Sequence, residues 1–368
     1  ASETAGNNAC FGYQAGKDNT TGDSITGIGS AALQSNTTGQ NNTAVGESAL
    51  QNNTTASSNT AVGKRSMETN TTGANNTAVG SYALFANTTG EPNTAVGFEA
   101  LKDNTTGGSN NAFGDRALAN NTTGQSNTAI GNLALFTQTS DGTKNIAVGN
   151  QSLYSNTTGD YNNALGESAL YTNTTGSSNI AIGDYALGVN TTGSNNVAVG
   201  RGALDANTTG TDNTALGTNA LDDSTTGNYN VAVGKHALTA NTTASENTAL
   251  GTTSLYTNET GTGNTAVGME ALKVSLDGSY NTAIGRRALD ANTSGSYNTA
   301  LGNSALDANT TASGNTALGT QALQNNETGA DNVAVGYKAG LNITSGLQNI
   351  CIGRDAGDTI STGGDNVF

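Results

Sequence analysis

Small apolar residues recur along this chain in a fixed pattern set among polar ones. A representative run, Asn42-Thr43-Ala44-Val45-Gly46, is followed by Ala49 and Leu50 and then starts again 17 residues later. Because Thr43 and Val45 alternate with Ala44, the run predicts a short strand with Ala44 on the opposite face. Such self-similarity at a fixed period indicates about twenty copies of one supersecondary unit.

Glycine marks the period most sharply. One glycine recurs every 17 residues, and a second sits ten residues after it. One coil is longer by a residue, and its insertion falls in a predicted turn between Thr137 and Thr143. Helices are not expected, because Asn, Thr and Gly fill most of each repeat and are poor helix formers. We place glycine at corners where φ is positive or backbones approach closely. The reference glycines are Gly46, Gly63 and Gly80.

Stacking these coils pairs each strand with its copy about 4.8 Å away along the axis. The sequence therefore predicts an all-β fold, an elongated parallel β-solenoid or β-roll of about 21 coils, on the order of 100 Å long. Its divisions are a variant N-terminal coil at 1–12, regular repeats over 13–353 and a variant C-terminal coil at 354–368. Coils near the two ends of the chain also differ from the rest, because they have Gly16, Gly340 and Gly357 where other coils have Leu or Met. Neither end shows a cap against strand addition, so end-to-end stacking is a further expectation.

Asparagine fills two ranks of the repeat. The rank four residues before the glycine, represented by Asn42, Asn59 and Asn76, is expected to form a hydrogen-bonded ladder of identical side chains. The other begins Asn-Thr-Thr, as at Asn53, and matches the N-glycosylation acceptor pattern. Glycans about 4.8 Å apart would collide, so we interpret this motif mainly as turn chemistry, with glycosylation at some coils as the alternative.

Composition leaves little material for a core. Hydrophobic residues are 34% of the chain, charged residues 11%, and there is no Trp. Each coil offers about four small apolar residues, such as Ala44, Val45, Ala49 and Leu50, which predicts a thin core. We therefore expect several copies to lie side by side, with the narrow Ala rank allowing close approach. A homotrimer is the first expectation and a slim monomer the alternative.

Net charge, hydrophobic runs and the first residues of the chain limit the classes of partner and the cellular location that we expect. The chain carries −15 with a pI near 4.2, which argues against nucleic acid as a partner. No hydrophobic run is long enough to insert into a membrane. The sequence begins Ala1-Ser2-Glu3 without Met, as a secreted protein does after signal removal, and as an expressed fragment would. We expect an extracellular or cell-surface location.

The repeat resembles a known family. Its pattern Asn-Thr-Ala-Val-Gly-x-x-Ala-Leu resembles Ser-Val-Ala-Ile-Gly-x-x-Ala in the YadA-like, left-handed β-roll heads of trimeric autotransporter adhesins, and it is similar to repeats in phage tail-fibre shafts. The runs that match best are Asn179–Gly183, Asn196–Gly200 and Asn332–Gly336. The adhesin heads have shorter coils, so the resemblance carries the fold better than the mode of attachment. It implies a trimeric surface fibre that binds other surfaces.

Two pairs of residues stand out as candidate sites. Cys10 and Cys351 replace Ala in coils near opposite ends, too far apart for an intrachain disulfide. They either link neighbouring subunits or act as small buried replacements for Ala. Tyr280 and Tyr297 lie one coil apart, where stacked surface rings would suit glycans or neighbouring fibres. The alternative is that they are isolated surface tyrosines.

Catalytic chemistry is not indicated. His236 is the single histidine, and the acidic residues scatter over variable positions without forming a column of paired carboxylates. Calcium-binding repeats, phosphate loops and zinc-ligand spacings are missing, so no enzyme, cofactor or metal site is predicted. Ice binding is an alternative raised by the Thr ranks, but at most one Thr of each adjacent pair can join a flat surface. We predict the structural, adhesive subunit of an extracellular fibre, with a phage tail-fibre shaft and an ice-binding solenoid as alternatives.

Overall fold

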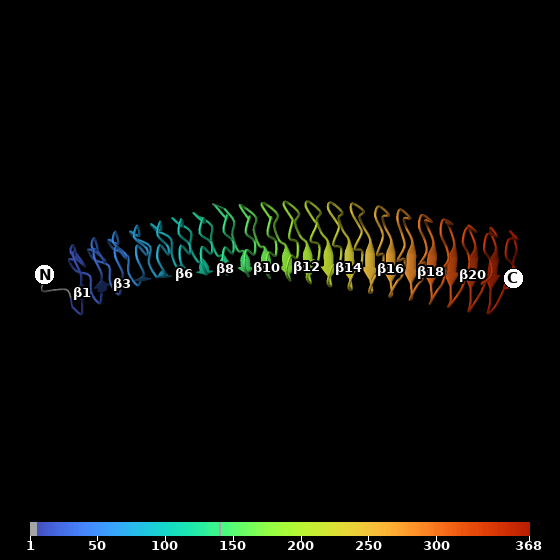
Figure 1. Cartoon of the computed structure of the whole chain (residues 1–368), viewed down its shortest axis with the longest axis horizontal. Helices are drawn as coiled ribbons and strands as arrows, with labels where there is room; N and C mark the ends of the chain where they lie inside the picture. Colours follow the sequence, from blue (N-terminus) through green and yellow to red (C-terminus); the bar gives the residue numbers. More distant parts are fainter. Residues whose placement is uncertain (1–5, 140) are drawn as a thin grey trace. The chain divides into compact units, whose positions relative to one another are not determined.

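The computed structural model describes residues 6–139 and 141–368, so residues 1–5 of the first predicted division lie outside it. Over the described ranges the chain is a parallel β-solenoid of 21 short strands without a helix, as the sequence predicted. It divides into two compact units, the first ending at Asp184 and the second beginning at Tyr185. Within each unit, successive coils each add one strand to the same side (Figure 1).

The strands are three residues long and begin one period apart. Those of the first unit are β1 (Ala9–Phe11), β2 (Thr26–Ile28), β3 (Thr43–Val45), β4 (Thr60–Val62), β5 (Thr77–Val79), β6 (Thr94–Val96), β7 (Asn111–Phe113), β8 (Thr128–Ile130), β9 (Ile146–Val148), β10 (Asn163–Leu165) and β11 (Ile180–Ile182). Those of the second unit are β12 (Val197–Val199), β13 (Thr214–Leu216), β14 (Val231–Val233), β15 (Thr248–Leu250), β16 (Thr265–Val267), β17 (Thr282–Ile284), β18 (Thr299–Leu301), β19 (Thr316–Leu318), β20 (Val333–Val335) and β21 (Ile350–Ile352).

Identical positions face one another in adjacent coils. Thr43 pairs with Thr60 and Ala44 with Ala61, in parallel register. The register is unbroken across the longer coil, where Thr128 pairs with Ile146. Side chains of one kind are therefore piled into ranks, which confirms the expected stacking.

The interior of each coil is narrow. Ala44, Ala49 and Leu50 are fully buried, together with Asn42 and Asn53. Val45, which the sequence analysis counts in the core, points outward, because it lies one residue from Ala44 on a strand whose faces alternate. The Ala rank is consequently filled by its own coil, and the expectation that it brings subunits together is wrong.

Two asparagine ladders hold the coils together. The Nδ2 of Asn70 donates to the Oδ1 of Asn53 (2.9 Å) and to the carbonyl oxygen of Gly73 (3.0 Å). In the second ladder, the backbone N–H of Asn59 donates to the Oδ1 of Asn42 (3.0 Å), while its own Nδ2 donates to Gly73 (3.0 Å). Each buried amide thus joins a neighbouring coil to a turn carbonyl. At Asn42, Asn59 and Asn76 the bond between coils runs from a backbone N–H to a side-chain Oδ1, and not between two side chains as expected.

The two glycine ranks serve different purposes. Gly63 has φ 134°, and a Cβ there would lie 2.5 Å from the carbonyl oxygen of Gly80. Gly73 lacks a positive φ but is crowded, since its Cβ would lie 2.6 Å from the carbonyl oxygen of Gly90. Left-handed backbone also occurs at residues other than glycine, such as Ser48 (φ 57°) and the buried Leu50 (φ 49°).

In the coil that has one extra residue, a longer side chain keeps the asparagine ladder connected. Gln138 replaces the ladder asparagine, and its Nε2 donates to the Oδ1 of Asn121 (3.2 Å) and to the carbonyl oxygen of Gly142 (2.6 Å). Its Oε1 accepts from the Nδ2 of Asn145 (3.2 Å) and of Asn156 (3.3 Å). One extra methylene therefore bridges the extra residue, which lies in the predicted turn; residue 140 is outside the described ranges.

The glycines of the variant coils make room for larger neighbours. A Cβ on Gly16 would lie 2.5 Å from the Sγ of Cys10, and one on Gly357 would lie 2.5 Å from the Sγ of Cys351. Each coil thus exchanges a Leu and an Ala for a Gly and a Cys. At Gly340 the space is taken by Ile343, which stands where other coils have the ladder asparagine.

Candidate interaction surface

The outward side of the strands forms a continuous face in each unit. We call the first and third residues of β2 to β21 the outer sheet face. Its third position is apolar in every strand, and side chains there are exposed by 37% at Val79, 41% at Ile130 and 49% at Leu165. Other exposed apolar residues at this position are Ile28, Phe113, Ile182, Leu216, Leu250, Ile284, Leu301 and Ile352. A strand face of this kind normally lies against another layer.

No charged residue occurs on the outer sheet face in any of these strands. Its first position is Thr in most strands and Ile or Val in several others, with Asn only at Asn111 and Asn163. Within residues 6–139 and 141–368, the charged residues are therefore confined to the turns and the other sides of the coils. In a chain of net charge −15, this is the surface that another acidic protein can approach without repulsion.

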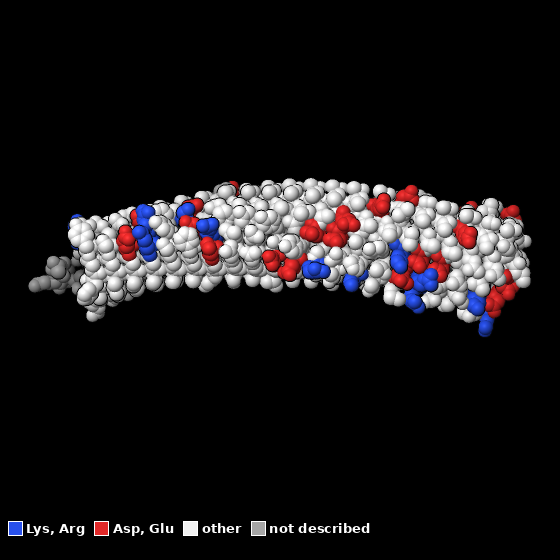
Figure 2. Space-filling view, viewed as in Figure 1, with Lys and Arg blue, Asp and Glu red and all other residues white. Residues whose placement is uncertain are grey.

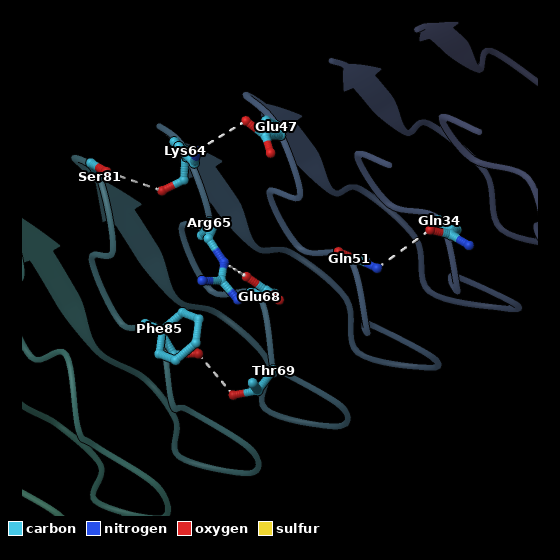
Figure 3. A network of polar contacts seen from close by, with 9 residues as sticks. All are labelled: Gln34, Glu47, Gln51, Lys64, Arg65, Glu68, Thr69, Ser81 and Phe85. Atoms are coloured by element: carbon cyan, nitrogen blue, oxygen red, sulfur yellow. Dashed lines mark hydrogen bonds and ion pairs between the residues drawn. The ribbon is translucent and has the colours of Figure 1, made fainter. Parts of the chain in front are cut away.

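On the face drawn in Figure 2, the charged side chains form small groups, some mixed and some acidic only, separated by uncharged surface. One such group spans several coils in the first unit (Figure 3). There the Nζ of Lys64 lies 3.2 Å from the carboxylate of Glu47, and Arg65 pairs with Glu68 while its guanidinium lies 5.0 Å from the ring of Phe85. Exposed pairs of this kind contribute at most about 1 kcal/mol each.

The predicted tyrosine pair does stack. The rings of Tyr280 and Tyr297 lie 5.4 Å apart and 15° from parallel, and the two residues are 54% and 66% exposed. A second stack that the sequence analysis missed joins Phe136, Tyr154 and Tyr171 at 5.4 and 5.2 Å. All three rings occupy one position of the repeat, five residues after the glycine, so indexing could have found them.

The two cysteines are free and differently placed. Cys351 is buried, with its side chain inside its own coil, whereas Cys10 is exposed. Partial desolvation raises the pKa of both thiols, including that of Cys10 although the residue as a whole is exposed, and this lowers the thiolate fraction at neutral pH. This environment agrees with small residues replacing Ala, and an intersubunit disulfide stays a prediction.

Two pairs of carboxylates lie in adjacent coils, so the expectation that acidic residues form no column is wrong. Asp205 and Asp222 share one position of the repeat, as do Asp290 and Asp307. Burial raises the pKa of Asp222, and the carboxylates of Asp223 and Asp205 raise it further. Burial likewise raises the pKa of Asp205. The signal was available in the sequence, since each pair is separated by one period.

Glycosylation of the Asn-Thr-Thr rank is incompatible with the fold in most coils. Asn53, Asn70 and their equivalents are fully buried with their Nδ2 atoms hydrogen-bonded. In the same motif the hydroxyl of Thr54 donates to the carbonyl oxygen of Thr71 (3.1 Å), and Thr55 is exposed. The motif is turn chemistry, and one Thr of each pair faces solvent, as expected.

Other kinds of site find little support in the described part of the chain. Residues 6–139 and 141–368 contain no group of three or more His, Cys, Asp or Glu side chains arranged to hold a metal ion. Within the same ranges, no helix could cross a membrane. His236 is half-buried, and its ring meets that of Tyr256 edge-on at 6.2 Å.

Comparison with known proteins adds no relative. No model of a known protein family matches this chain, and a search of curated proteins found no match either. The outer sheet face is therefore the feature from which we infer a function.

Proposed function

We propose that this chain is a structural subunit of an extracellular fibre, assembled side by side through the outer sheet face. The observation that carries the proposal is the uncharged rank of apolar side chains present in every strand from β2 to β21, exposed at positions such as Val79, Ile130 and Leu165 and half-buried at the others. Leaving such a rank in water forfeits about 25 cal/mol for each Å² of apolar surface that a partner would cover.

A second copy of the chain is the partner that fits this face best. Both copies have the same distance between successive coils. The outward side chains of one copy can therefore pack between those of the other over many coils, without the two repeats drifting out of step. Two β-sheets pack about 10 Å apart when their facing side chains interdigitate. Since all charges lie elsewhere, the approach of two acidic chains along this face brings no like charges together.

The size of the face is adequate for a stable contact. Ten strand spacings of about 4.8 Å and a width of about 10 Å give roughly 500 Å² of plan area in each unit. Each unit by itself thus offers more than half of the roughly 800 Å² that each partner contributes to a standard interface. Three copies closing around one axis is the number that the resemblance to adhesin heads implies.

The adhesive role is assigned to the exposed stack of Tyr280 and Tyr297. Both residues are more than half exposed, and such rings combine apolar area with hydrogen bonding. A glycan array probed with the wild-type protein and a Tyr280→Ala, Tyr297→Ala variant tests this role. Loss of binding in the variant supports it, and unchanged binding removes these two residues from it.

Sedimentation equilibrium tests the assembly. We expect the wild-type chain of 36.6 kDa to run at three times that mass. A Val79→Glu, Ile130→Glu variant should run as a monomer, because each carboxylate would be buried against an apolar rank. The matched control, Asn52→Glu with Asn132→Glu, adds the same charge at exposed turn positions and should remain a trimer. A monomeric wild type would contradict the proposal.

Location and the alternative functions need separate tests. Antibody labelling of intact producing cells distinguishes a surface fibre from a phage tail-fibre shaft, which would appear on virions. Ice binding is favoured by one observation, the exposed rank Thr38, Thr55 and Thr72. It is opposed by the interruptions of the same rank at Asp277, Ser294 and Ser345. Thermal hysteresis measurement decides this alternative.

A further inference from the structure

Two asparagines stand at the first position of the outer sheet face, which elsewhere holds Thr, Ile or Val. Asn163 begins β10, and its register partners are Ile146 in β9 and Ile180 in β11, which are 45% and 36% exposed. Asn111 begins β7 between two threonines. Asn is disfavoured in strands. In all the other strands from β2 to β21, a β-branched residue fills this position.

Neither amide is used by the chain itself. Within the described residues, the side chains of Asn111 and Asn163 make no hydrogen bond, unlike the buried ladder asparagines. While the face is exposed to solvent, the missing hydrogen bonds carry no energetic penalty, because water can bond to both side-chain amides. Under a partner, each amide must find both a donor and an acceptor or remain unsatisfied.

We propose that Asn111 and Asn163 set the register of the assembly, so that three parallel chains meet with equal residues at equal height. This inference rests on the proposed lateral assembly. An asparagine amide offers a donor and an acceptor, so identical residues around a threefold axis satisfy one another. A single polar residue in an apolar seam specifies alignment in this way in coiled coils, at some cost in stability.

Other alignments lose these contacts. A shift of one coil would place Asn163 against Ile146 or Ile180 of a neighbour and bury the amide unpaired. A shift of three coils would match Asn111 with Asn163 but leave one asparagine of each chain without its counterpart. An antiparallel pair could match the two residues, and chains shifted along the axis form open, staggered assemblies, but a closed ring of three identical chains is both parallel and unshifted by symmetry. Only the unshifted parallel trimer satisfies both.

Cysteine reporters test the register directly. In a background with Cys10→Ala and Cys351→Ala, one chain receives Thr77→Cys and a second, distinguishable chain receives Thr128→Cys. These positions begin β5 and β8, three coils apart, the same offset as Asn111 to Asn163. After the chains are refolded together, a short bifunctional thiol cross-linker should join like cysteines only.

The Asn111→Val, Asn163→Val variant should still assemble, because it gains apolar surface. Mixed cross-links between the Thr77→Cys chain and the Thr128→Cys chain should then rise by about tenfold or more, as shifted registers become equivalent. The control, Asn52→Val with Asn132→Val, removes two exposed amides away from the face and should keep cross-links between like cysteines only.

The outcomes separate the two proposals. A wild-type trimer with abundant mixed cross-links, or a double variant that keeps a single register, would overturn the role of the asparagines while leaving lateral assembly intact. A monomeric wild type would instead remove the assembly itself, and the register with it.

Discussion

At the scale of single residues, the buried amides carry more of the structure than the apolar side chains. Each coil buries only two Ala and one Leu, while two asparagines per coil are hydrogen-bonded to neighbouring coils. A buried amide that is fully paired fixes geometry strongly, because every alternative leaves it unsatisfied. This explains why a chain with 34% hydrophobic residues and no Trp can be ordered.

Removing one ladder amide should therefore be costly. The Asn70→Ala variant leaves the Oδ1 of Asn53 without its donor, and it leaves the Nδ2 of Asn87 with only its bond to the carbonyl oxygen of Gly90. We expect the free energy of unfolding to fall by about 2–5 kcal/mol, since each buried unpaired polar group costs about 1–3 kcal/mol. Denaturant unfolding measures it. Asn52→Ala, at an exposed position of the preceding coil, should change stability by no more than about 0.5 kcal/mol.

The stacked carboxylates predict a pH dependence of stability. Because burial and neighbouring carboxylates raise the pKa of Asp222 in the folded chain, the folded state holds a proton that the unfolded state releases first. Stability should therefore fall as pH rises from 3.8, the ordinary pKa of an Asp carboxyl, through the higher pKa of the folded state. Asp222→Asn should raise the melting temperature at neutral pH and flatten this part of the profile. A variant whose profile matches the wild type would contradict the assignment.

At the scale of the coil, period and alternation sufficed to predict strands, register and corner glycines, but not which apolar rank faces inward. Alternation separates Ala44 from Val45 without saying which is inside. Size could have decided it. The inner rank accepts only Ala, Gly or Cys from β1 to β21, whereas the outer rank varies from Val to Phe. A narrow interior restricts volume and a free surface does not.

Other features lay beyond reach of the sequence. The left-handed backbone of Leu50 (φ 49°) could not be predicted, because a buried Leu gives no local signal for it and such a conformation costs about 1–2 kcal/mol. It is imposed by the stack, in which the N–H of Leu50 donates to the carbonyl oxygen of Ser66 (3.0 Å). The role of Gln138 could not be predicted either. Only its hydrogen bonds show that its side chain, one methylene longer than that of Asn, maintains the ladder in the coil that has one extra residue.

The two glycine ranks should differ in their tolerance of a methyl group. Gly63→Ala adds a Cβ 2.5 Å from the carbonyl oxygen of Gly80 at φ 134°, a backbone region that other residues rarely adopt. We expect a loss of about 3 kcal/mol or more in the free energy of unfolding. Gly73→Ala should cost distinctly less, because the same rank already contains Ala at Ala56 and Ala244. Equal losses in thermal or denaturant unfolding would show that φ is not the deciding factor.

At the scale of the whole molecule, each coil contacts its neighbours through the same set of bonds, so stability should be close to a sum over coils. Nothing in such a chain requires a particular number of repeats, whereas the phase of the repeat is essential. Every rank, inner or outer, depends on positions one period apart. A change that preserves the phase should therefore be tolerated, and one that breaks it should not.

Deleting residues 77–93 tests this directly. The deletion removes one 17-residue period and joins Asn76 to Thr94, which restores the run Asn-Thr-Ala-Val-Gly with its strand, glycine and ladder asparagine. We expect an unchanged far-ultraviolet circular dichroism spectrum and a melting temperature within about 4 °C of the wild type, the loss expected for one coil among many. The control deletes residues 77–85, a shorter segment, and joins Asn76 to Ala86. It removes β5 with its glycine and places turn residues where a strand must pair with β4 and β6. That variant should melt far lower or fail to fold, and equal tolerance of the two deletions would mean that stacked ranks do not hold the coils together.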